Sequence, residues 1–194
     1  MTDGLAISRN AQVGAIALAL SATLGAAIIW RGPGLVPLRI VALFGTALGL
    51  VCLCDELGAG RPLNRAGLIL FAGAFCAKLL MLVSADPLTA ARATITYAFA
   101  MFGALLLWSV ALLHHSGAAK RMGALGTAAS IASIAFLIAG HLAVALGSLA
   151  GFAGLYAALD GSAEKARSAS VTIETIAWLW CLAASGLLWH SPID

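Results

Sequence analysis

Residues 93–113 read ATITYAFAMFGALLLWSVALL and contain no charged side chain. A helix rises about 1.5 Å per residue, so about 20 apolar residues cross the roughly 30 Å hydrocarbon core of a bilayer. The stretch therefore has the length and apolarity of one membrane-spanning helix. It is preceded by ADPLTAAR and followed by HHSGAAKR, whose proline, glycine and charges are typical of the ends of a span.

Five further segments follow the same pattern, separated by breaks such as RGPG, DELGAGRPLNR and DGSAEKAR. Lipid cannot satisfy free backbone groups, so an open chain crosses it as helices. The prediction is an all-α, polytopic membrane helical bundle of about six transmembrane helices, forming a single integral membrane domain over residues 1–194. The predicted spans are about 11–30, 35–54, 66–84, 93–113, 122–147 and 170–189.

The composition agrees with this assignment, because 62% of the 194 residues are hydrophobic and 10% are charged, with a mean hydropathy of +1.01. Soluble domains average about 45–50% apolar and about 25% charged residues. A soluble domain is therefore excluded, and the lipid bilayer is the expected partner. The net charge of +3 is small and its basic residues are scattered, so we expect no nucleic-acid binding.

Two features bear on topology. The start MTDGLAISRN lacks the basic region of a secretory signal, and Val13 to Trp30 is too long for a signal core, which predicts a retained first span. Six spans place both termini on one side. The basic residues divide evenly between the two sides, so the positive-inside rule leaves the orientation open.

The stretch from Met122 to Leu159 is too long for one perpendicular crossing and too short for two. Gly147 and Ser148 predict a break, after which residues 149–159 are interfacial, re-entrant or part of a long span. A surface helix carries a charged face, and this segment has none before Asp160. Burial against other spans, or one long tilted helix, is therefore favoured.

Small and soft residues suggest packing and one metal alternative. GTALG at 45–49 fits the small-xxx-small pattern that lets membrane helices approach closely, which predicts a tight bundle. Homo-oligomerisation or membership of a larger membrane complex stays open. Cys52 and Cys54 are interpreted as small hydrophobes; with Asp55 and Glu56 beside them, a soft-metal site is the alternative.

Three ionisable residues fall inside predicted spans, where a charge at mid-depth costs roughly 2.5–3.5 kcal/mol on insertion scales. Lys78 either extends its ammonium to the headgroups or points inward and pairs with a carboxylate, Glu174 being the best partner. Glu174 is either stabilised by the helix dipole or faces inward as a ligand or proton carrier. His141 is either hydrogen-bonded to a neighbouring helix, a metal or haem ligand, or part of a proton relay.

The last two of these predict a shared site. If the sixth span is antiparallel to the fifth, His141 and Glu174 lie at similar depth, and they are the candidate metal ligands. A matched pair of histidines for a mid-membrane haem is missing from the sequence. The hydrolase patterns GxSG and HExxH and aspartate-rich phosphotransferase motifs are missing too. We therefore expect no enzyme and no catalytic residues.

Two short motifs give a family resemblance. GHLA at 140–143 resembles the Gly-His-Ala-like step late in one span of CopD-type copper resistance proteins. IETIAWLWCLAASGLL at 173–188 resembles their following acid/histidine and tryptophan element, with Glu174 where that family tends to have histidine. The resemblance implies a polytopic membrane protein that handles copper, with a copper ion held by His141 and Glu174.

These observations favour a small transporter or permease-like protein, with a metal ion such as copper as the candidate substrate. The alternative is a non-catalytic accessory or scaffold subunit of a larger membrane protein complex. Both place the chain as an integral protein of a bacterial inner (plasma) membrane.

Overall fold

Five long apolar helices and one shorter helix make up the described part of the chain. The computed structural model describes residues 9–31, 36–58, 61–149 and 175–189, which contain helices and turns and no strand. The long helices are α1 (Arg9–Arg31), α2 (Val36–Glu56), α3 (Pro62–Val83), α4 (Pro87–Leu112) and α5 (Gly117–Leu149). The shorter one, Thr175–Trp189, is the C-terminal helix.

Each of the five long helices is long and apolar enough to cross a membrane. This confirms the predicted all-α membrane bundle of about six helices. Along a helix the backbone N–H and C=O groups bond to one another, which is what a hydrocarbon environment requires.

Three helices begin four or more residues earlier than their predicted spans. α3 begins at Pro62 and α4 at Pro87, where the sequence had been interpreted as loop up to residues 66 and 93. Proline is accommodated in the first helical turn, because its missing N–H would have no partner there. Asp86 assists α4, since its Oδ2 accepts a hydrogen bond from the Thr89 backbone N–H at 2.8 Å. α5 begins at Gly117 instead of residue 122.

The far end of α5 bears on the ambiguous stretch that follows it. The helix continues through Gly147 and Ser148 and ends at Leu149, so the predicted break falls within its last turn. The alternatives for residues 149–159 concern a segment that, beyond Leu149, lies outside the described residues.

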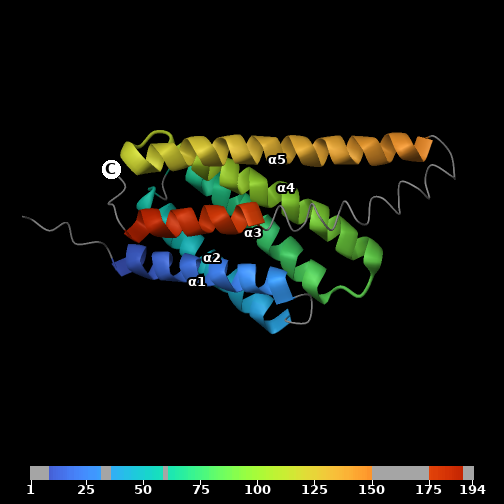
Figure 1. Ribbon diagram of the computed structural model, residues 1–194, viewed down its shortest axis with the longest axis horizontal. Helices are drawn as coiled ribbons and strands as arrows, with labels where there is room; N and C mark the ends of the chain where they lie inside the picture. The colour runs from blue at the N-terminus through green and yellow to red at the C-terminus, as the bar shows by residue number, and fades with distance from the viewer. Residues whose placement is uncertain (1–8, 32–35, 59–60, 150–174, 190–194) are drawn as a thin grey trace, which may run out of the picture.

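The helices pack as antiparallel neighbours (Figure 1). α1 packs on α2, α3 on α4, and α5 on α4. The C-terminal helix is bonded to two of them: Ser185 Oγ donates to the Ala15 carbonyl of α1 at 2.8 Å, and Trp180 Nε1 donates to Ser109 Oγ of α4 at 3.0 Å.

The C-terminal helix is antiparallel to α1. The ring of Trp178 lies against Gly25, whereas Leu188 lies near Gly14, so residue numbers rise in one helix as they fall in the other. The beginning of α1 and the end of the C-terminal helix therefore lie at the same end of the bundle, as Figure 1 shows. This arrangement agrees with an even number of crossings.

Glycines allow the closest helix contacts, as the GTALG pattern predicts. A Cβ on Gly49 would lie 3.0 Å from the Gly14 carbonyl oxygen and would collide with Leu18. Gly45 stands directly against the Ser21 hydroxyl of α1. The small residues of α2 thus let its backbone approach α1, and van der Waals contact at short range stabilises such pairs in lipid.

A candidate functional site: a cationic cavity at one end of the bundle

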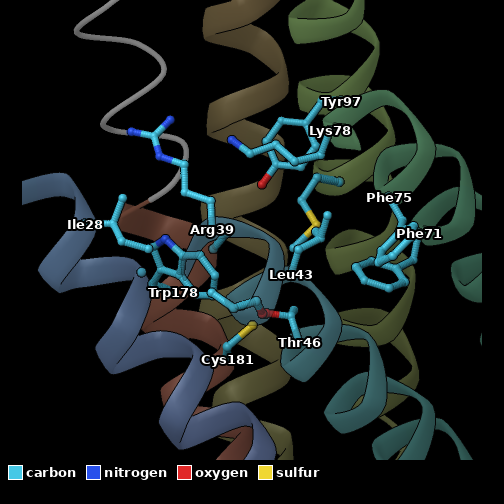
Figure 2. A pocket seen from close by; sticks show the side chains of 14 residues that line it. Ile28, Arg39, Leu43, Thr46, Phe71, Phe75, Lys78, Tyr97, Trp178 and Cys181 are labelled. Atoms are coloured by element: carbon cyan, nitrogen blue, oxygen red, sulfur yellow. The ribbon is translucent and has the colours of Figure 1, made fainter. Parts of the chain in front are cut away.

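A cavity lies where α1 ends, α2 begins, α3 ends and the C-terminal helix begins, with α4 completing its wall. Its volume is about 40 Å³, and one water needs about 10–15 Å³ on the same measure. It therefore has room for about three waters or a small polar group. Figure 2 shows two basic side chains, Arg39 and Lys78, on one side of it and Thr46 and Cys181 on the other.

Lys78 points into the bundle. Its side chain is 8% exposed, and its Nζ lies 4.7 Å from the centroid of the Tyr97 ring on α4. The face of an aromatic ring attracts a cation, by about 0.5–2 kcal/mol depending on desolvation. Lys78 is thus buried against Tyr97, and both alternatives for it, extension to the headgroups and inward pairing with a carboxylate, stay predictions. Its pairing with Glu174 stays a prediction, because Glu174 lies outside the described residues.

Arg39 brings a second basic group to the same cavity. It lies one turn into α2, and its guanidinium offers several N–H donors. The Nε atom of Arg39 is buried and has no hydrogen-bond partner in the described structure. A buried donor without a partner costs roughly 1–3 kcal/mol, and more when it is charged. The position therefore favours a ligand that accepts a hydrogen bond.

Trp178 supplies a third donor. Its ring lines the cavity, and its buried Nε1 likewise has no partner in the described structure. The ring fits there because Gly25 of α1 leaves room for it. The Thr46 hydroxyl, by contrast, already donates to the Ala42 carbonyl at 2.8 Å, as threonine commonly does within a helix.

The electrostatics of the cavity favour an anion. Two basic residues line it, and among the described residues around it none is acidic. Opposite charges attract more strongly in a low-dielectric interior than in water, so these basic side chains favour an anion over a metal cation.

The candidate metal ligands lie elsewhere. His141 belongs to α5, and its side chain, like the whole of Glu174, lies outside the described residues. Gly126 of α5 is in contact with Trp180, which sets the relative height of the two helices. Counted from that contact along each helix at about 1.5 Å per residue, the backbone of His141 lies about 15 Å further along the bundle axis than that of Thr175. Their pairing as metal ligands stays a prediction.

The cluster of Cys52 and Cys54, with Asp55 and Glu56 beside them, does not gather its side chains around one point. Residues two apart on a helix point about 200° apart around its axis, and Cys54 Sγ lies 3.5 Å from the Asn64 carbonyl oxygen, inside the bundle. Asp55 is exposed and receives a hydrogen bond from Asn10 Nδ2 at 3.5 Å. Within the described ranges no three His, Cys, Asp or Glu side chains gather in a way that could hold a metal ion.

Two cavity residues were missed in the sequence. Arg39 is not among the candidate residues of the sequence analysis, although VPLRIVALFG carries it inside the second predicted span. A basic residue within an apolar run was the signal that identified Lys78, and the same signal applied to Arg39. For Trp178 the pattern AWLW gave no indication of which indole faces the interior.

No family model, curated protein or solved structure matches this chain.

Proposed function

We propose that this protein is a small transporter or permease-like membrane protein whose solute pathway includes the cavity between α1, α2, α3, α4 and the C-terminal helix. The observation that carries the proposal is Lys78, a basic side chain buried inside the membrane bundle at the wall of a cavity. Basic residues buried within a membrane bundle are costly, and they mark substrate or ion pathways in many membrane proteins.

Solute flux tests the proposal directly. The full chain is reconstituted into liposomes, and uptake of inorganic phosphate, of a small carboxylate such as acetate and of copper is measured. We expect uptake of at least one of them, slowed at least tenfold by Lys78→Gln.

Arg92→Gln is the matched control, because Arg92 is an exposed basic residue near the same end of the bundle and does not line the cavity. Absence of uptake for all three solutes, with protein that is folded and correctly inserted, would contradict transport through this cavity.

Copper transport is the metal-ion form of the proposal, and it rests on other observations than the cavity. It rests on the resemblance to CopD-type proteins and on His141 and Glu174, not on the cavity, whose basic residues repel a cation. Metal analysis of detergent-purified protein, with and without His141→Ala, tests it. We expect about one copper ion per chain in the parent and a loss of most of it in the variant; equal metal content in both would exclude His141 as a ligand.

The alternative function, an accessory subunit of a larger membrane complex, is favoured by α5. Among the long helices α5 packs on α4, and it keeps large apolar side chains exposed, such as Leu125 at 74% and Phe136 at 66%. Lipid covers such a face as well as a partner protein does. Flux without any partner would therefore exclude the subunit function as the whole role of the chain.

A further inference from the structure

We infer that the cavity binds an anionic group of the phosphate or carboxylate type, held by Arg39, Lys78 and the indole N–H of Trp178. The inference rests on the proposed function only in that both use the same cavity. Binding requires no flux, and it can be measured separately.

The donors are already in place. Arg39 Nε and Trp178 Nε1 are both buried and both lack a hydrogen-bond partner in the described structure. Both residues line one cavity together with Lys78. Arginine presents a planar fork of N–H groups that matches carboxylate and phosphate oxygens, and charge-assisted hydrogen bonds of this kind are roughly twice as strong as neutral ones.

The remainder of the wall strengthens these contacts. It consists largely of apolar side chains, including Phe71, Phe75 and Met101. Such a wall excludes water and lowers the local dielectric constant, so the attraction between an anion and the two basic groups is greater than at a solvated surface. The cavity lies at one end of the bundle, which places it within reach of that membrane surface.

A neighbouring hollow distinguishes two possible sources of the anion. A groove of about 200 Å³ lies between α1 and the C-terminal helix, is lined mostly by apolar residues, and shares Trp178 with the cavity. Leu179 and Leu182 beside it are exposed on the bundle surface. An anionic lipid could place its phosphate in the cavity and part of an acyl chain in this groove; a free anion would use the cavity alone.

Two binding measurements on the detergent-purified full chain test the inference. In the first, inorganic phosphate is titrated and the shift in unfolding temperature is recorded, since a ligand that binds the folded state stabilises it. In the second, native mass spectrometry compares retention of phosphatidylglycerol with that of phosphatidylcholine. We expect a phosphate-dependent shift, selective retention of phosphatidylglycerol, or both; the lipid source gives the second without the first.

The variants identify the site. Arg39→Gln and Lys78→Gln should each weaken anion binding at least tenfold, and Arg39→Lys, which keeps the charge and loses the fork, should recover part of it. Trp178→Phe should weaken it severalfold, because the ring stays and the N–H is removed. The controls Arg92→Gln and Trp189→Phe, both at exposed positions, should bind like the parent.

Two results would overturn the inference. One is the absence of both phosphate binding and lipid selectivity in folded parent protein. The other is equal binding by the parent, Arg39→Gln and Lys78→Gln, provided that the variants elute as the parent does on size exclusion. Anion binding without flux in liposomes would leave this inference standing and contradict only the transport proposal.

Discussion

At the scale of the residue, the bundle is held by a few polar contacts between helices in addition to apolar packing. Ser185 is buried in the C-terminal helix, and its hydroxyl donates across to the Ala15 carbonyl of α1 at 2.8 Å. Ser133 is also buried, but its hydroxyl donates to Ala129 of its own helix at 2.8 Å. Only the first of these bonds joins two helices.

We therefore expect Ser185→Ala to lower the free energy of unfolding by about 0.6 kcal/mol, the average for hydrogen bonds between membrane helices, and by at most about 1.7 kcal/mol. Ser133→Ala should change it by less, because the bond that it removes lies within α5 and joins no second helix. Unfolding in mixed detergent micelles, followed by circular dichroism, measures both. Equal effects of the two substitutions would show that the bond to Ala15 adds nothing of its own.

The residue scale is also where sequence reasoning was least complete. Lys78 could be found because a charge in an apolar run is rare, and Arg39 carried the same signal. What the sequence lacks is the direction of a side chain. Whether a lysine extends to the headgroups or turns inward depends on a partner from another helix, here the ring of Tyr97, and nothing local to Lys78 indicates it.

At the scale of the element, helix starts were harder to predict than helix existence. The six apolar segments were predicted because a 30 Å hydrocarbon core imposes a length on each. The prolines at 62 and 87 were interpreted as ends of loops, whereas each opens a helix. The polar turns before the apolar runs continue these helices into the membrane surface, where water and capping groups satisfy their first N–H groups.

The contact between α4 and α5 depends on one glycine. A Cβ on Gly123 would lie 2.6 Å from the Ser109 carbonyl oxygen and 2.8 Å from the Leu113 nitrogen, both backbone atoms. Backbone cannot give way as a flexible side chain can, so the helices would have to separate. We expect Gly123→Ala to destabilise the bundle by about 1–3 kcal/mol, the usual cost of overpacking.

Gly73→Ala is the matched control, because a Cβ at Gly73 would meet no atom within 4 Å. Alanine there should be neutral or slightly stabilising, since it favours helix over glycine by up to about 1 kcal/mol. Thermal unfolding in detergent compares the two variants. A Gly123→Ala protein as stable as Gly73→Ala would mean that α5 does not pack as closely on α4 as the structure has it.

At the scale of the whole molecule, the described helices alternate in direction and return the chain to the end at which it began. The predicted placement of both termini on one side follows from this alternation. Reporter domains fused at residue 1 and at residue 194 should therefore respond from the same compartment in intact cells. Reporters on opposite sides would require an odd number of crossings and would contradict the antiparallel packing of the C-terminal helix on α1.

The length of α5 bears on which of its residues lie at the two membrane surfaces. Its 33 residues measure about 50 Å, and even at the largest usual inclination, about 40°, they exceed a 30 Å core. Lys120 and Arg121 are exposed near its beginning and belong at the headgroups. About 30 Å further along the helix comes His141. With Lys120 and Arg121 at one headgroup boundary and α5 close to perpendicular to the membrane, the backbone of His141 reaches the opposite boundary of a core of about 30 Å.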